Sequence, residues 1–254
     1  MRNTLSSLMI AGMALVPTLG QAQDLDVRNM TPEQRAVFGA EVRSYLLQNP
    51  EVIFEAIQIL EEKRNRAAET ADQEMLERHA KAIYEDGFSF IGGNPDGDVT
   101  LVEFSDYRCG YCKRAHAEVQ EVLDRDPNVR LIVKEFPILG PDSVAAGRMA
   151  LAALAMDPSK YLDLNDELMT YNGNLTEQVA YKIAGNVGYD IAELKERAGG
   201  EAVEAQLQQN YRLAQALGLQ GTPAFIVGTE VIRGYLPVDD LLSAITDARN
   251  EGGG

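Results

Sequence analysis

Residues 99 to 136 read VTLVEFSDYRCGYCKRAHAEVQEVLDRDPNVRLIVKEF, and the architecture can be built outward from them. Val99 to Phe104 is rich in β-branched and aromatic residues, Cys112 to Asp124 has a helical pattern, and Val129 to Phe136 is a second β-rich run. A strand, a crossover helix and a strand in succession predict a parallel βαβ unit.

Both cysteines of the 254-residue chain lie in this unit, at Cys109 and Cys112, separated by Gly110 and Tyr111. A structural disulfide usually closes a longer loop, because its stabilisation grows with the length of chain that it constrains. Cysteines three apart on a helix share one face and can cycle between dithiol and disulfide without backbone movement. The pair therefore predicts redox chemistry.

The position of the pair after a strand predicts different roles for the two thiols. If the helix begins at the motif, its free N–H groups and dipole lower the pKa of Cys109, while Cys112 lies one turn deeper and is shielded. Cys109 is then the exposed, attacking sulfur and Cys112 the resolving one. Gly110 and Tyr111 tune the stability of the thiolate.

Two further side chains near the pair each allow two interpretations. Alternation along the first strand places Glu103 either among apolar neighbours, where it can relay the proton of Cys112, or facing solvent on a sheet edge. His116, four residues after Cys112, can interact with the thiols, although a lone helical histidine is more often a surface or packing residue.

Helical patterns precede the unit. Thr31-Pro32-Glu33-Gln34 predicts a capping box and a helix to about Gln48, and a second helix follows from about Glu51 to Glu85. Its first half carries a short apolar seam at Ile53, Ile57 and Leu60. The pattern leaves open whether this helix packs on its own domain or pairs with copies of itself.

Strand and helix signals also flank the unit on both sides. Phe88 to Ile91 alternates as a short edge strand, and about 141 to 217 is helical throughout, which predicts an inserted helical subdomain. Ala224 to Val227 and Glu230 to Arg233 predict a hairpin, and a helix follows from about 237 to 249. The expected fold class is α/β.

Residues 1 to 22 have the pattern of a secretory signal peptide. Arg2 is followed by a mostly apolar stretch, and Gly20-Gln21-Ala22 provides small residues for cleavage after Ala22. The alternative is an uncleaved anchor, but the apolar run is short and Pro17 breaks it. Export favours thiol chemistry, since disulfides persist outside the cytosol.

The formal net charge of −16 argues against nucleic acid or anionic lipid as a partner. Most of this charge is expected to form a solvated face that keeps the protein soluble. It identifies no substrate.

Two separated motifs, VEFSDYRCGYCK at 102 to 113 and GTPAFIVG at 221 to 228, resemble the DsbA-like branch of thioredoxin-fold thiol-disulfide oxidoreductases. The resemblance implies a thioredoxin fold with the helical subdomain inserted and no cofactor. It also implies that Thr222-Pro223 is a cis-proline loop facing the cysteines, that Glu103 is a buried acid beneath them, and that Cys109 is the nucleophile.

Residues 41 to 60 are similar to the N-terminal segment of the suppressor-of-copper-sensitivity protein C group, a segment associated with oligomerisation and, in some members, trimers. The resemblance divides the chain into a signal peptide at 1 to 22, a helical extension and oligomerisation stalk at 23 to 86, and a catalytic domain at 87 to 254. A homo-oligomer is expected, with a trimer favoured.

The Cys-Gly-Tyr-Cys pair departs from the Cys-Pro-His-Cys of strongly oxidising DsbA proteins and is similar to that of disulfide isomerases such as DsbC, as is Thr222 before the proline. We therefore expect a periplasmic protein disulfide isomerase or reductase. It acts on disulfide-containing clients, and a membrane redox partner sets the oxidation state of its thiols. The close alternative is a DsbA-like oxidase that introduces disulfides.

A binding function of another class is a copper-tolerance module in which Cys109 and Cys112 hold Cu(I), since soft thiolates suit that ion. The signal for zinc is weak, because four ligands are usual and only His79 and His116 are available to assist.

Overall fold

The structure, a computed structural model, describes residues 27 to 252 and divides the chain into two units, one ending at Glu61 and the other beginning at Glu62. The predicted signal peptide lies outside the described residues. Helix α2 (Glu51–Tyr84) runs across the boundary between the units.

The first unit contains α1 (Pro32–Gln48) and the beginning of α2. The predicted capping box is confirmed: the amide of Gln34 donates to the Thr31 hydroxyl (3.2 Å), and the amide of Thr31 donates to the Gln34 side chain (2.9 Å). No side chain of α1 is buried. In the described part of this unit the exposed large apolar side chains are Val27, Val37, Phe38, Val42, Tyr45, Leu47, Ile53, Phe54, Ile57, Ile59 and Leu60.

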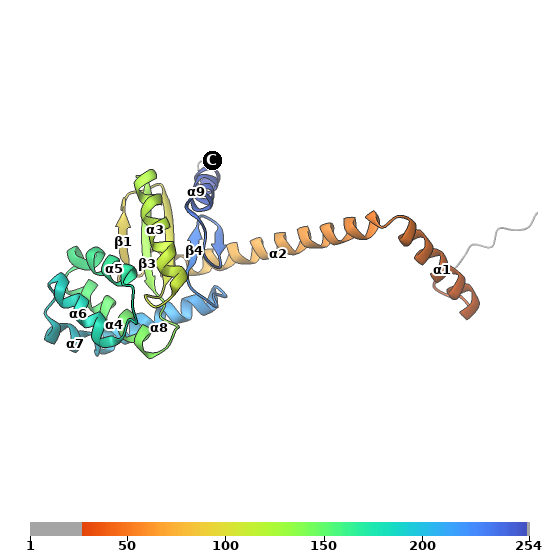
Figure 1. The fold of residues 1–254 in the computed structure, drawn as a ribbon. Helices are drawn as coiled ribbons and strands as arrows, with labels where there is room; N and C mark the ends of the chain where they lie inside the picture. The colour runs from red at the N-terminus through yellow and green to blue at the C-terminus, as the bar shows by residue number, and fades with distance from the viewer. Residues whose placement is uncertain (1–26, 253–254) are drawn as a thin grey trace, which may run out of the picture. The chain divides into compact units, whose positions relative to one another are not determined.

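The second unit is built on a five-stranded sheet in the order β1-β3-β2-β4-β5 (Figure 1). Its strands are β1 (Phe90–Gly93), β2 (Val99–Ser105), β3 (Val129–Glu135), β4 (Ala224–Val227) and β5 (Glu230–Ile232). Strands β2 and β3 are parallel and are joined by α3 (Gly110–Arg125), so the predicted βαβ unit is confirmed. The remaining strand pairs are antiparallel.

The first strand lies two residues later than the sequence predicts. Asp86 accepts hydrogen bonds from the amides of Phe88 (3.0 Å) and Ser89 (2.9 Å), which holds these two residues in a turn instead of a strand. Strand β1 therefore begins at Phe90, and it is an edge strand as expected. The hairpin strand β5 likewise ends at Ile232, one residue before the predicted end.

The segment between β3 and β4 is helical, as predicted. It contains α4 (Pro141–Met156), a 3₁₀ turn (Pro158–Lys160), α5 (Tyr161–Thr170), α6 (Glu177–Val187), α7 (Ile191–Ala198) and α8 (Glu201–Ala216). Helix α9 (Val238–Gly252) closes the described chain. The predicted α/β fold class, with inserted helices and an N-terminal helical extension, is confirmed.

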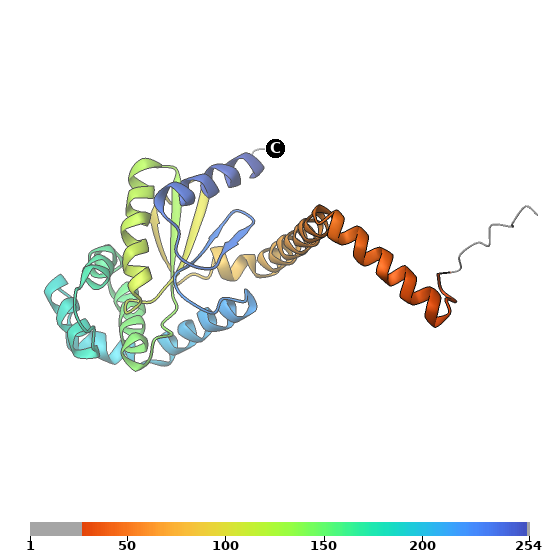
Figure 2. The same cartoon turned by 45° about the vertical axis from the view of Figure 1, so that its right-hand side comes forward.

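The two faces of the sheet are covered by different helices (Figure 2). Alternate residues such as Leu101 and Leu131 pack with side chains of α3 and α9, whereas Val102 and Ile132 pack with α8 and the end of α2. Helix α3, which carries Cys112, therefore covers the sheet face on which β2 residues 99, 101, 103 and 105 lie.

A buried ion pair attaches the end of α2 to the sheet. The Lys134 side chain is completely buried, and its Nζ donates to Asp86 Oδ2 (2.7 Å), to the Ala82 carbonyl (2.9 Å) and to the Ser89 hydroxyl (3.3 Å). Burial lowers the pKa of Lys134, and its pairing with Asp86 opposes that shift. The ammonium thus has partners for all three of its protons.

Removing Asp86 should be strongly destabilising, because Lys134 would remain buried without its counter-charge. We expect Asp86→Ala to lower the free energy of unfolding by about 3–5 kcal/mol. Urea titration followed by circular dichroism measures this as a lower midpoint with an unchanged slope. Asp96→Ala, at an exposed turn position, is the control and should change stability by less than about 0.5 kcal/mol. Equal midpoints for the two variants would contradict the account.

Candidate active site

The loop from β2 to α3 is fixed by one buried carboxylate. Asp106 Oδ2 accepts from the amides of Ile138 (2.8 Å) and Leu139 (3.0 Å), and its Oδ1 accepts from the amide of Arg108 (2.8 Å). The Cys109 amide donates to the Asp106 carbonyl (3.0 Å). This loop delivers Cys109 to the N-cap of α3, where its backbone is extended (φ −77°, ψ 118°).

Both thiols are largely covered. Cys112 is 0% exposed and Cys109 is 8% exposed, so Cys109 is the more accessible sulfur, but the expectation that it is openly exposed was wrong. The reason is the loop opposite: in the thiol form Cys109 Sγ donates to the Thr222 carbonyl at 3.2 Å. The Thr222–Pro223 peptide bond is cis, so this loop has the form and position that the resemblance implied.

The two thiols differ in proton affinity. A hydrogen bond from the Cys112 thiol is the main cause that lowers the pKa of Cys109 to about 5; burial opposes it, and Thr222 and the amides of Cys112 and Tyr111 assist. The same thiol–thiol hydrogen bond, together with burial, raises the pKa of Cys112 well above its ordinary value. At neutral pH the pair therefore holds one thiolate, on Cys109.

The low pKa of Cys109 links the stability of the reduced protein to pH. The pKa is depressed in the folded state, so the thiolate's contribution is complete above the unfolded pKa of about 8.5 and is lost as the pH falls through about 5. We expect thiolate absorbance at about 240 nm to titrate with a midpoint near pH 5 and to be lost in Cys109→Ser. The stability of the reduced wild type relative to Cys109→Ser should rise between pH 5 and pH 8.5. A midpoint near pH 8.5 in the folded wild type would contradict this.

Glu103 is buried, and the interpretation that it faces solvent on a sheet edge was wrong. It is 4% exposed on β2, between Val133 of β3 and Phe225 of β4. Burial raises the pKa of Glu103 to about 7. Charge on Glu103 in turn raises the pKa of Cys112. A carboxyl that titrates near neutrality beside the resolving thiol is suited to accept its proton.

His116 is a packing residue rather than a partner of the thiols. It is buried on α3, and its Nε2 lies 3.0 Å from Asp166 Oδ1 of α5. The neighbouring Lys113 donates to the carbonyls of Leu168 (3.3 Å) and Tyr171 (2.5 Å) at the end of α5. Both side chains thus join the active-site helix to the helical insertion.

The outer surface beside the pair is aromatic and cationic. Tyr111 is 57% exposed, and the Arg114 guanidinium lies 5.1 Å from its ring centroid and 5.5 Å from that of Tyr235. Tyr235 is held in turn by a hydrogen bond from its hydroxyl to Glu118 (2.6 Å). The spacer residue Tyr111 therefore presents a ring to whatever approaches Cys109.

Sequence reasoning missed one buried group. The carboxyl of Glu135, at the end of β3, accepts from the hydroxyls of Tyr107 (2.7 Å) and Tyr161 (2.9 Å). Alternation from Val133 was the available signal that Glu135 lies on the same face as Glu103, but its position beside Lys134 at a strand end is equally typical of exposed charge.

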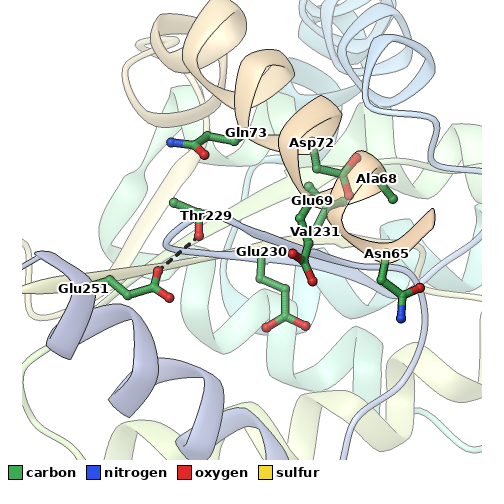
Figure 3. Close-up of a pocket in the computed structure, with 9 residues that line it drawn as sticks. All are labelled: Asn65, Ala68, Glu69, Asp72, Gln73, Thr229, Glu230, Val231 and Glu251. Carbon is green, nitrogen blue, oxygen red and sulfur yellow. Dashed lines mark hydrogen bonds between the residues drawn. The ribbon is translucent and has the colours of Figure 1, made fainter. Parts of the chain in front are cut away.

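A pocket without cysteines in its lining lies between the second half of α2, the β4–β5 hairpin and the end of α9. Its volume is about 840 Å³, and carboxylates line it (Figure 3). Thr229 donates to Glu251 (3.2 Å) across its rim. Its lining residues are Asn65, Ala68, Glu69, Asp72, Gln73, Thr229, Glu230, Val231 and Glu251.

Within residues 27 to 252, no three His, Cys, Asp or Glu side chains gather in an arrangement that could hold a metal ion. In the same part of the chain, no helix combines the length and apolar character needed to cross a membrane.

A sheet with a Cys-X-X-Cys pair at the start of its crossover helix and a cis-proline loop opposite defines the thioredoxin-type class of thiol-disulfide oxidoreductases. The family model for the DSBA-like thioredoxin domain matches residues 100–246, and that for the copper resistance protein ScsC N-terminal domain matches residues 34–67. The chain belongs to the DSBA-like thioredoxin domain family.

Solved structures agree with this assignment. A thioredoxin-like oxidoreductase from Silicibacter pomeroyi is 42% identical, with a TM-score of 0.65 over 67% of this chain and 97% of that one. Proteus mirabilis ScsC in a transitional conformation is 27% identical, with a TM-score of 0.64 over 87% of this chain and 100% of that one.

Curated relatives include disulfide bond formation protein D of Bacillus subtilis, 23% identical over 60% of this chain and 73% of that protein. They also include Na(+)/H(+) antiporters NhaA, such as that of Salinispora arenicola, 24% identical over 62% of this chain. The chain spans about a quarter of the length of these antiporters (24% in that case).

Proposed function

We propose that this protein is an exported thiol-disulfide oxidoreductase that rearranges or reduces incorrect disulfides in other proteins through Cys109 and Cys112. The observation that carries the proposal is the placement of the pair: Cys109 lies at the N-cap of α3 with its Sγ 3.2 Å from the Thr222 carbonyl, and Cys112 is completely buried one turn later. The pKa is lowered at Cys109 and raised at Cys112, in agreement with these positions. One sulfur is prepared to attack, and the other keeps its proton until it is needed.

In the first step the Cys109 thiolate attacks one sulfur of a client disulfide. A bond forms between Cys109 and that sulfur, and the second client sulfur leaves as a thiolate. The Thr222 carbonyl lies 3.2 Å from Cys109 Sγ, so the cis-proline loop forms the opposite wall of the attack site. Thr222 and Pro223 thus orient the approaching client chain.

The mixed disulfide then has two outcomes. The Cys112 thiol gives its proton to Glu103 and attacks Cys109, which forms the Cys109–Cys112 disulfide and releases the reduced client. Alternatively, another client thiolate attacks the client sulfur of the mixed disulfide, which forms a new client disulfide and returns Cys109 as a thiolate. Repetition of the second outcome is isomerisation.

Isomerisation is favoured over oxidation by two features. The Gly110-Tyr111 spacer and Thr222 are similar to those of disulfide isomerases, and the first unit leaves its apolar side chains exposed in the single chain. We assign residues 23 to 86 to an oligomerisation extension, residues 87 to 254 to the catalytic domain, and a trimer to the assembly. Several active sites around a shared space can hold one misfolded client.

The proposed location is the periplasm, reached through cleavage of the signal sequence after about Ala22. A membrane redox partner would supply electrons that keep the pair reduced. Support comes from the signal pattern at residues 1 to 22 and from a structure that is 30% identical over 67% of this chain, described as a periplasmic thioredoxin-like protein from Salmonella enterica.

The proposal is tested by mixing the reduced full chain with a protein disulfide such as insulin, in the presence of glutathione, and measuring disulfide turnover. A Cu(I) titration followed by ultraviolet absorbance is run on the same sample, because a copper module would bind the ion without turnover. Catalytic turnover supports the oxidoreductase. Stoichiometric Cu(I) binding with no disulfide turnover above the glutathione background would contradict the oxidoreductase and support a copper-binding module.

A further inference from the structure

Glu135 is a buried acid that the mechanism above does not use. It is 3% exposed at the end of β3 and pairs in register with Ser105 of β2, just as Val133 pairs with Glu103. Side chains two apart on a strand lie on the same face, so Glu103 and Glu135 are diagonal neighbours on the face that α3 covers. Two buried carboxyls thus share this face of the sheet.

The Glu135 carboxyl is fixed from two sides. Tyr107, two residues before Cys109, donates its hydroxyl to Oε1 at 2.7 Å, and Tyr161 at the start of α5 donates to the same oxygen at 2.9 Å. The Asn165 amide donates to the Tyr107 oxygen at 3.2 Å, which directs the tyrosine proton toward the carboxyl. Two hydroxyl donors on one oxygen favour the carboxylate form and so oppose the effect of burial on this acid.

The Glu103 carboxyl is left with unused bonding capacity. Its Oε1 and the hydroxyls of Ser105 and Thr222 are buried and make no hydrogen bond in the structure. Such groups are rare in folded proteins. Glu103 is therefore free to accept a proton, whereas Glu135 is held in one orientation.

We propose that Glu103 and Glu135 act as a coupled pair of carboxyls on the sheet face that α3 covers, in which Glu135 is a positioning residue that controls when Glu103 can accept the thiol proton. This inference rests on the proposed function and names the group that regulates its resolving step. Because charge on either carboxyl opposes charge on the other, Glu103 is fully ionised only after both protons of the pair have left.

The groups around the pair agree with this coupling. Burial raises the pKa of Glu103 to about 7 and that of Glu135 to about 8, and the charges of Asp106 and Glu103 contribute to the rise at Glu135. The hydroxyls of Tyr107 and Tyr161 oppose the rise at Glu135. On the side of α3 the titrating group that faces Glu103 is Cys112, whose pKa is raised by the charge of Glu103.

Glu103 carboxylate takes the proton of the Cys112 thiol, and the Cys112 sulfur attacks Cys109 Sγ. The Cys109–Cys112 bond forms as the bond from Cys109 to the outside sulfur breaks, and the leaving thiolate is protonated by water or by Glu103. In this step the outside sulfur is reduced and the Cys112 sulfur is oxidised, while Cys109 exchanges one disulfide bond for another.

The test uses the reduced full chain and excess glutathione disulfide, with the reaction stopped in acid and the protein species separated. Cys109 is a thiolate above about pH 5, so mixed disulfide forms throughout pH 6 to 9 and its first-order decay reports attack by Cys112. We expect this rate to rise in two inflections in the wild type. In Glu135→Gln we expect a single inflection at a lower pH. The expected shift is about one pH unit, because two sites titrate as a pair when their interaction exceeds about one pK unit.

Two variants separate control of the proton from simple structural damage. Glu135→Asp keeps a carboxyl and should retain both inflections. Tyr161→Phe removes one hydrogen-bond donor to the Glu135 carboxylate, which should raise the pKa of Glu135 and move the upper inflection to higher pH. In Glu135→Gln, by contrast, the upper inflection should be absent. The thiolate absorbance of Cys109 should titrate near the same pH in all of these proteins.

A profile for Glu135→Gln that matches the wild type in shape and midpoint would overturn the proposal, and so would an unchanged upper inflection in Tyr161→Phe. The second variant keeps the proposal open to refutation if Glu135→Gln does not fold. Glutathione exchange can be measured even if the chain acts on no protein client. Failure of this inference and failure of the proposed function are therefore distinguishable.

Discussion

Replacing Cys109 by serine should reduce disulfide exchange by about 10³-fold or more, because the remaining thiol at position 112 is completely buried and keeps its proton. Serine is close in size to cysteine, so the packing against the cis-proline loop is retained. The measurement is the rate at which the reduced protein consumes a protein disulfide in glutathione buffer. The expected rate is that of the buffer alone.

Cys112→Ser is the matched variant and should behave differently. It keeps the Cys109 thiol but lacks the resolving sulfur, so the mixed disulfide with a client should accumulate and be visible as a covalent adduct by intact-protein mass spectrometry. Cys112→Ala, which removes the hydrogen-bond donor at this position, should also raise the pKa of Cys109. Adducts on Cys112 in the Cys109→Ser variant would contradict the assignment of the two roles.

Placing a charge in the apolar seam of α2 should separate the copies of an oligomer. Ile57 is 47% exposed in the single chain, and Ile53 beside it is 48% exposed. If this surface is buried between copies, Ile57→Asp would bury an unpaired carboxylate, at a cost of several kcal/mol, and weaken association by more than about tenfold. Light scattering measures the mass of the assembly, and isomerase activity should fall with it.

Gln58→Asp adds the same charge one position along, at an exposed polar residue outside the predicted seam, and should leave the mass unchanged. Both variants should keep their exchange with small disulfides, because Ile57 lies in the first unit and the thiols lie in the second. A wild type that is monomeric by light scattering would contradict the proposed homo-oligomer. If the two substitutions dissociated the oligomer equally, the apolar seam of α2 would not be the contact between copies.

Much of the second unit could be predicted from local pattern. The order of strand, helix and strand over 99 to 136 follows from period and residue type, although α3 begins at Gly110, two residues before the helical pattern that the sequence shows. The boundaries of β1 could not be predicted in the same way. They depend on Asp86, whose carboxylate captures the amides of Phe88 and Ser89, and no periodicity encodes that contact.

The burial of Glu103 could not be decided from alternation alone. Alternation gives the face of a strand, but burial also depends on which strands lie on either side. Here β4, more than a hundred residues later in the chain, pairs with β2 and places Phe225 opposite Glu103. Only a contact between distant segments excludes the sheet-edge interpretation.

The roles of His116 and Glu135 depend on the helical insertion. His116 meets Asp166, and Glu135 meets Tyr161, and both partners come from α5. The sequence predicts that helices are inserted, but not which face of α5 packs toward the sheet. The polar side chains that such a helix contributes as partners therefore cannot be predicted until the packing of the helix is known.

The central claim is that the Cys109–Cys112 pair rearranges disulfides in other proteins. Its most direct test is the recovery of enzymatic activity from scrambled ribonuclease, compared with the oxidation of reduced ribonuclease by the same full-length protein. The account predicts recovery by the wild type and none by Cys109→Ser. Rapid oxidation of reduced ribonuclease without recovery of the scrambled form would contradict it.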